Sequence, residues 1–157
     1  MNNKGTKKQS SAFAIPDWKR VQVPADVERL ATAVVDSAFA VHQELGPGLL
    51  ESTYEACLSH ELQLRGVKHQ LQLPVPLNYK GMRVEIGCRA DVVVEEKLLV
   101  ELKAVDQLLP IHTAQVITYL RLKKFPLGLL INFNETLIKH GIHRVLNVPR
   151  SPGEVLT

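Results

Sequence analysis

The chain has 157 residues, a length typical of one domain, and its 45% hydrophobic and 22% charged content is ordinary for a soluble globular protein. No apolar run approaches the ~20 residues of a membrane span, and the first residues lack the apolar core of a signal peptide. Cys57 and Cys88 are too few for a disulfide scaffold and lack the spacing of a zinc site. These features favour a cytoplasmic protein over a membrane-embedded or disulfide-rich secreted one.

The charge is spread unevenly along the chain. Residues 1–24 hold five Lys and Arg side chains against one Asp, a net charge of +4, so the remainder carries −1. We expect residues 1–24 to form a basic, disordered N-terminal tail, residues 25–148 a single domain, and residues 149–157 a C-terminal tail. A folded part without net positive charge would bind a polyanion through a local patch or through a bound metal.

The first half of the expected domain begins with two helices. Apolar residues recur at helical spacing over 25–45 and again over 50–65, and Gly46-Pro47-Gly48 separates the two runs. Weak alternation over 67–77, turn residues at 78–81 and an apolar run at 82–86 predict a hairpin. Two prolines, Pro74 and Pro76, favour an edge position for its first strand.

The second half alternates strands and helices. Apolar runs predict strands at Val92–Val94, Leu98–Val100 and 127–133, a helix over 111–124, and a final strand or helix over 138–148. This order predicts an α/β (α+β) fold, in which a mixed sheet of about four to five strands is flanked by helices.

The central stretch, residues 87–104, places charged residues within two apolar strands joined at Glu95-Glu96-Lys97. If the hairpin is centred on Glu96, Asp91 lies directly across from Glu101, whereas a two-residue turn would move Asp91 to the wrong face. Successive strand residues point to opposite faces, so Glu101 and Lys103 share one side. The first register therefore brings two carboxylates and an ammonium group together.

Adjacent carboxylates repel each other, and a cation between them relieves the repulsion. A hard divalent ion such as Mg²⁺ prefers oxygen ligands and is commonly held by one or two carboxylates. A lysine beside such an ion can orient an attacking water or offset charge on a phosphate. The alternative is a pair of solvated salt bridges, Glu101 with Lys103 and Asp91 with Arg89.

Two helices carry further candidates. Glu51 and Tyr54 share a face of the second helix, although Glu51 could equally be an ordinary first-turn acidic residue. On the helix at 111–124, His112, Gln115 and Tyr119 form one stripe. An amphipathic residue at the core edge would explain Tyr119 as well, and a surface amide would explain Gln115.

These residues resemble the signatures of a known superfamily. Asp91 followed by Glu101-Leu102-Lys103 resembles the bipartite signature of the PD-(D/E)XK nucleases. Gln115 to Tyr119 is similar to the Q-x-x-x-Y motif of RecB-like exonucleases in that superfamily. Gly48 to Tyr54 matches G-x-x-E-x-x-Y, the motif that names the GxxExxY proteins, a small prokaryotic group of the same superfamily. The resemblance covers roughly residues 34–147.

The resemblance implies a restriction-endonuclease-like fold and a role for each matching residue. Mg²⁺, or Mn²⁺ as a substitute, would be bound by Asp91, Glu101, the Leu102 carbonyl and Glu51. Lys103 would position or activate water, while Gln115 and Tyr119 would contact the phosphate backbone or orient the lysine. Ala90 departs from the proline that gives the superfamily its name. His42 lies where exonuclease relatives often have a metal-binding histidine, and a surface role is an equal alternative.

The expected function is Mg²⁺-dependent hydrolysis of phosphodiester bonds in nucleic acid, with DNA the favoured substrate and no membrane partner. The alternative is a catalytically inactive nuclease-fold module that binds nucleic acid or a protein partner. Since the chain is short, it also leaves open a homodimer or an accessory-subunit role. Hydrolysis of another phosphate ester is a third reading, for which the sequence offers no positive sign.

Overall fold

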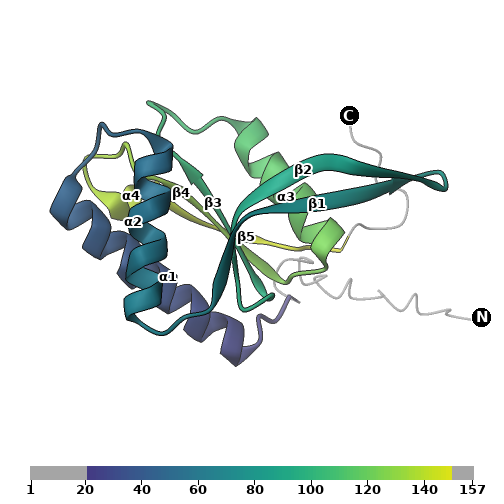
Figure 1. Ribbon diagram of the computed structural model, residues 1–157, viewed down its shortest axis with the longest axis horizontal. Helices are drawn as coiled ribbons and strands as arrows, with labels where there is room; N and C mark the ends of the chain where they lie inside the picture. The colour runs from purple at the N-terminus through teal and green to yellow at the C-terminus, as the bar shows by residue number, and fades with distance from the viewer. Residues whose placement is uncertain (1–20, 150–157) are drawn as a thin grey trace, which may run out of the picture.

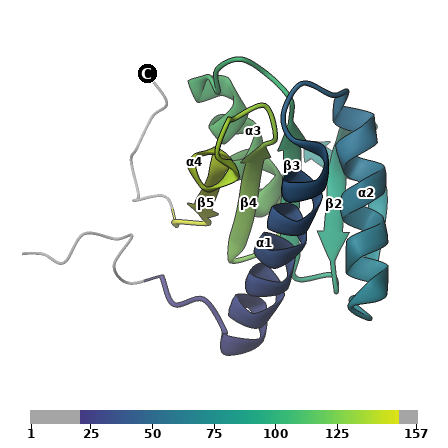
Figure 2. The ribbon, with the colours of Figure 1, turned by 90° about the vertical axis from the view of Figure 1, so that its left-hand side faces the viewer.

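A computed structural model describes residues 21–149, and two long helices come first in them. The helices α1 (Ala25–Leu45) and α2 (Glu51–Leu64) lie side by side on one face of the sheet (Figure 2). The loop between them contains Gly46 at φ 65° and Gly48 at φ 99°, left-handed values that glycine adopts without steric cost. The predicted boundaries of both helices are therefore correct to within one residue.

The sheet has five strands in the order β1-β2-β3-β4-β5 (Figure 1). The strands are β1 (His69–Tyr79), β2 (Met82–Val94), β3 (Leu98–Lys103), β4 (Leu127–Asn132) and β5 (Ile142–Leu146). The pairing of β3 with β4 is parallel, and the other neighbouring strands pair antiparallel. The predicted mixed sheet flanked by helices is thus confirmed.

Helices cover both faces of the sheet. The helix α3 (Pro110–Lys123) connects the parallel strands β3 and β4 and packs on the face opposite α1 and α2, as Figure 1 shows. Each face has its own apolar core. One core joins α1 and α2 to the sheet through residues such as Val34 and Leu58, and the other joins α3 through Val116 and Leu120. The short helix α4 (Ile138–Gly141) precedes β5.

One prediction about the strands needs correction. The apolar runs at 82–86 and Val92–Val94 belong to one strand, β2, since the backbone stays extended through Gly87. For the segment 138–148 the sequence predicts a strand or a helix, and the structure has both, the four-residue α4 and the strand β5. The edge position of β1 is as the prolines predict, because β2 is its one neighbour in the sheet.

The expected N-terminal tail over residues 1–24 and C-terminal tail over 149–157 lie almost wholly outside the described residues, so they stay predictions. Among residues 21–149, none of the helices is both long enough and apolar enough to cross a bilayer.

Candidate active site

The predicted register of the β2–β3 hairpin is confirmed. Val92 pairs with Val100 and Val94 with Leu98, and the chain turns at residues 95–97. Continued by one residue beyond the last ladder pair, this register places Asp91 opposite Glu101. The two residues are only 8% and 2% exposed, so two acidic groups lie together in the protein interior.

Only one of these two carboxylates is well satisfied by hydrogen bonds. The Leu102 backbone N–H donates to Asp91 Oδ2 at 2.8 Å. In contrast, Glu101 Oε2 is buried and has no hydrogen-bond partner among the described residues. Burial raises the pKa of Glu101 to about 9, and the neighbouring Asp91 reinforces the shift. A buried acceptor without a partner is costly, which indicates that this oxygen is arranged for a ligand or a proton.

Lys103 lies on the same side of β3 as Glu101, as the alternation of strand residues predicts. Its Nζ is 3.9 Å from Glu101 Oε1, and the Lys103 side chain is 17% exposed. Leu102, between them, points into the core shared with α1 and α2. The end of β3 is fixed further because the Phe133 N–H donates to the Lys103 carbonyl at 2.8 Å.

The first residue of α2, Glu51, joins this group from the other side. Its pKa is raised, mainly because the carboxylate is partly removed from water. The positive charge of Lys103 opposes the shift, whereas Asp91 and Glu55 add to it. Glu51 therefore faces the same charges as the strand residues. We call Glu51, Asp91, Glu101 and Lys103 the carboxylate–lysine cluster.

The helix α3 brings Gln115 and Tyr119 to the edge of this cluster. Gln115 Nε2 donates to the Tyr119 hydroxyl at 2.8 Å. Tyr119 is 3% exposed, and burial raises the pKa of its hydroxyl, with a smaller contribution from the charge of Glu101. Tyr119 is therefore not a residue at the edge of the core. It packs inside the core that joins α3 to the sheet, and its hydroxyl lies close enough to Glu101 to respond to its charge.

Two polar residues that the sequence did not single out also contact the cluster. Gln72 Nε2 donates to Glu55 Oε2, and it lies 3.3 Å from Asp91 Oδ1. Glu55 could have been found from its spacing, since it lies one helical turn after Glu51. Gln72 had no such signal, because its φ of 51° is a left-handed value that the sequence does not announce.

The sequence of residues 28–145 matches the family model described as the PD-(D/E)XK nuclease superfamily. The chain belongs to that superfamily. Searches of curated proteins and of solved structures found no match. Members of the superfamily are in general nucleases, which are hydrolases that bind nucleic acid, and they typically use divalent metal ions.

The donor atoms of this nuclease-superfamily site suit such an ion. Asp91 and Glu101 offer carboxylate oxygens, the hard ligands that Mg²⁺ and Mn²⁺ prefer. The unpartnered Glu101 Oε2 and the raised pKa of Glu101 both fit a site that binds a cation, because a positive charge there would stabilise the ionised carboxylate. Within residues 21–149, no three His, Cys, Asp or Glu side chains are already gathered closely enough to bind a metal. Of the expected metal ligands, Asp91 and Glu101 are thus the two carboxylates that the structure places together.

His42 makes its hydrogen bond outside the carboxylate–lysine cluster. It is buried on α1, and its Nε2 donates to the Glu135 carbonyl at 2.8 Å, in the segment between β4 and α4. This contact ties α1 to the end of the sheet. Tyr54, the last residue of the G-x-x-E-x-x-Y run, is also structural. Its hydroxyl donates to the Gly46 carbonyl at 2.6 Å, and its ring stacks on Phe133.

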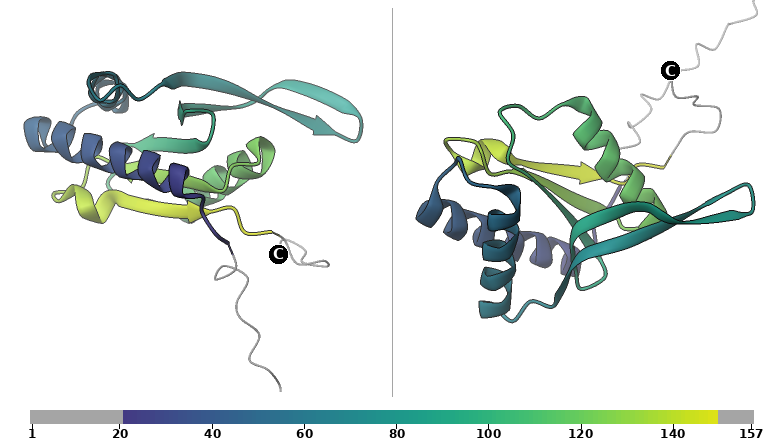
Figure 3. Two further views of the ribbon diagram at one scale, coloured as in Figure 1. Left: turned by 90° about the horizontal axis from the view of Figure 1, so that it is seen from below. Right: turned by 45° about the horizontal axis from the view of Figure 1, so that its top comes forward.

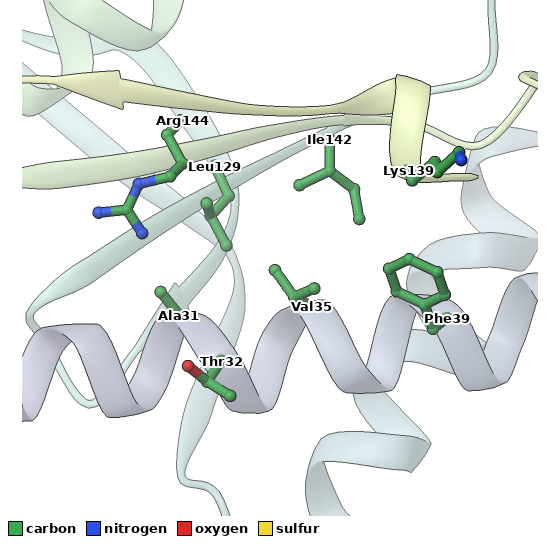
Figure 4. A pocket seen from close by; sticks show the side chains of 8 residues that line it. All are labelled: Ala31, Thr32, Val35, Phe39, Leu129, Lys139, Ile142 and Arg144. Carbon is green, nitrogen blue, oxygen red and sulfur yellow. The ribbon is translucent and has the colours of Figure 1, made fainter. Parts of the chain in front are cut away.

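A hollow of about 310 Å³ lies between α1 and the β4–β5 edge of the sheet (Figure 4). Its wall is apolar along Val35, Phe39 and Ile142, and Lys139 and Arg144 lie at its margin. None of its lining residues belongs to the carboxylate–lysine cluster. The cluster is therefore identified by its electrostatics and register, and this hollow plays no part in it.

Proposed function

We propose that this chain is a divalent-metal-dependent nuclease that hydrolyses phosphodiester bonds, with DNA as its substrate. The observation that carries the proposal is the buried pair Asp91 and Glu101 beside Lys103. Burying two carboxylates side by side costs free energy unless a cation or a proton neutralises them. The two residues also stand at the positions that match the superfamily signature. The G-x-x-E-x-x-Y run and the Gln115–Tyr119 spacing favour the GxxExxY group and its RecB-like relatives.

The metal would be held by Asp91, Glu101 and the Leu102 carbonyl, with Glu51 closing the site from α2. A divalent cation bound there would supply charge neutralisation at the scissile phosphate and acidify a water molecule. Lys103 Nζ would donate hydrogen bonds to the attacking water or to a phosphate oxygen, which orients the two for in-line displacement. The hydrogen-bonded Gln115 and Tyr119 would hold the phosphate backbone next to that lysine.

The test is a cleavage assay on purified protein with single- and double-stranded DNA and RNA, in Mg²⁺ or Mn²⁺. Asp91→Ala and Lys103→Ala should each abolish cleavage and leave the fold intact. Lys97→Ala is the matched control, because Lys97 lies on the turn between β2 and β3 and pairs with Asp26 at 2.7 Å, outside the cluster. Cleavage by either cluster variant at the wild-type rate would refute the proposal.

The alternative, an inactive module that binds nucleic acid or a protein, predicts a different pattern. Isothermal titration with Mg²⁺ and Mn²⁺ would then give no heat of binding, and no substrate would be cut. Because Asp91, Glu101 and Lys103 are all present and mutually close, active chemistry is the better-supported proposal.

A further inference from the structure

The hairpin of β1 and β2 extends well beyond the rest of the sheet (Figures 1 and 3). The strand β3 pairs with β2 only at Val92, Val93 and Val94. Beyond that point, β2 pairs with β1 alone, at residues 82–84 and again at 88–90, on either side of a bulge. We call residues 73–90 the arm. A two-stranded ribbon is marginally stable in water by itself, so its length calls for a functional explanation.

The tip of the arm presents apolar side chains to solvent. Tyr79 pairs with Met82, and the two side chains are 58% and 59% exposed. The next pair on the same face, two residues back on each strand, is Leu77 with Val84. One face of the ribbon is therefore an apolar stripe that no other described element covers at its end.

Positive charge flanks this stripe. Lys80 lies in the two-residue turn, with its Nζ 5.5 Å from the centroid of the Tyr79 ring. Arg83 is exposed on the strand that follows, where its Nε pairs with the equally exposed Glu85, a solvated contact that a phosphate can replace. With Arg89, the arm carries three basic residues and one acidic residue, a net charge of +2, whereas residues 21–149 together carry −1. The arm is thus a basic projection from an otherwise acidic body.

The arm is also continuous with the candidate active site. Asp91 is the next residue of β2 after the arm ends, and Val75, near its base, packs in the same core as Tyr119. The helix α3, whose last turn carries Arg121 and Lys123, contacts β1, the first strand of the arm. A ligand held along the arm would therefore run towards the carboxylate–lysine cluster.

We propose that the arm is a substrate clamp that enters the minor groove of a nucleic-acid duplex, with Tyr79 and Met82 as the apolar wedge and Lys80 and Arg83 on the phosphates. This inference rests on the proposed nuclease function and names the surface that holds its substrate. Minor-groove proteins commonly insert apolar side chains between base steps and surround them with basic ones. A second copy of the chain fits less well, because four side chains on a narrow ribbon cover far less than the roughly 1,000 Å² of a stable interface.

The test compares binding of fluorescent DNA by four proteins, all in the Lys103→Ala background with Mg²⁺ so that the probe is not cut. The first is the background itself. The second adds Lys80→Ala with Arg83→Ala, and the third adds Tyr79→Ser with Met82→Ser. The fourth adds Lys68→Ala with Lys139→Ala, a control that removes the same charge from exposed positions away from the arm tip. Anisotropy is measured over a series of salt concentrations with a duplex and with one of its single strands.

The basic variant should bind the duplex about tenfold more weakly, and the slope of log K against log salt should fall by about 2, one unit for each lost phosphate contact. The apolar variant should lose affinity for the duplex with an unchanged salt slope. The control should match the background, and all four should melt alike, because the altered side chains are exposed.

Three outcomes would overturn the proposal. One is duplex binding by both arm variants that equals that of the control. Another is an apolar variant that weakens single-strand and duplex binding equally, since a groove is then not involved. The third is a background protein that sediments as a dimer and becomes a monomer only in the apolar variant, with DNA affinity unchanged. Failure of the nuclease proposal looks different, because wild-type protein would then bind DNA through the arm without cutting it.

Discussion

Asp91 of β2 and Glu101 of β3 lie against each other on neighbouring strands, and both are almost completely buried. The pKa of Glu101 is raised to about 9 by burial and by Asp91, which means that the metal-free folded protein holds a proton there at neutral pH. The unfolded chain releases this proton near the ordinary carboxyl pKa of about 4.3. This difference makes the stability of the metal-free protein depend on pH.

Between those two pKa values the folded state binds more protons than the unfolded state, so stability falls as pH rises. In chelator, the free energy of unfolding should decrease from pH 5 to pH 8 by up to about 1.4 kcal/mol per pH unit. Urea denaturation at several pH values measures this slope. Glu101→Gln, which cannot ionise, should flatten it, and a wild-type curve already flat over that range would contradict the assignment.

Sequence patterns predicted the parts of this site that depend on periodicity. The turn at residues 95–97 fixes which β2 residue meets Glu101, and alternation along β3 fixes the side of Lys103. Helical spacing located α1 and α2 in the same way. These features are local, so a single sequence contains them.

Contacts between segments that are distant in the sequence could not be predicted from these local patterns. The length of β2 was missed because Gly87 reads as a break, although the structure passes through it as strand. Gln72 was missed because its role depends on a left-handed backbone opposite Asp91 and on Glu55, which comes from a helix earlier in the chain. The burial of Tyr119 depends on how β1 crosses α3, which the helix alone does not determine.

Gln72 should matter more for activity than for stability. It is exposed, and its φ of 51° costs a non-glycine residue about 1 kcal/mol. Gln72→Gly removes that strain together with the amide that lies 3.3 Å from Asp91 Oδ1. We expect a melting temperature equal to or above that of the wild type, with nuclease activity reduced because Asp91 loses an orienting donor.

Gln70→Gly is the matched control, since Gln70 is exposed on the same strand and has no left-handed backbone. This variant should lose about 1 kcal/mol of stability and keep its activity. Equal activity in the two glycine variants would show that Gln72 does not position Asp91.

Tyr54 should contribute to stability through its hydroxyl group. The side chain is fully buried, its hydroxyl donates to the Gly46 carbonyl at 2.6 Å, and it accepts from the Leu49 N–H at 3.1 Å. Tyr54→Phe keeps the stacking on Phe133 but removes both hydrogen bonds that the buried hydroxyl makes to the backbone of the α1–α2 loop. The expected loss is about 1–3 kcal/mol in the free energy of unfolding.

Chemical denaturation measures this loss, with Tyr79→Phe as the control on an exposed tyrosine. That control should stay within about 0.5 kcal/mol of the wild type. Because the Gly46–Leu49 loop leads directly into Glu51, Tyr54→Phe should also weaken metal binding. A stability equal to that of Tyr79→Phe would mean that the loop holds its shape without the hydroxyl.

Substitution of two buried glycines by alanine compares a steric clash with backbone to a steric clash with side chains. A Cβ at Gly141 would overlap the backbone carbonyl of Asn132, whereas a Cβ at Gly128 would meet the flexible side chains of Val116 and Leu120. Neither glycine has a left-handed φ, so alanine fits both backbones and only space is at issue. Side chains can rotate away, but the carbonyl is fixed at the end of β4.

Gly141→Ala should therefore destabilise the protein by about 3 kcal/mol or more, and Gly128→Ala by about 1–2 kcal/mol. Asn132 also connects this position to the site, because its side chain bonds both the N–H and the carbonyl of Val105, two residues after Lys103. A shift of Asn132 would move that segment, so Gly141→Ala should lose cleavage activity at temperatures where it is still folded. Thermal melts and cleavage assays on the two variants decide the matter, and a Gly141→Ala protein as stable and active as Gly128→Ala would show that α4 can move away from β4 at little cost.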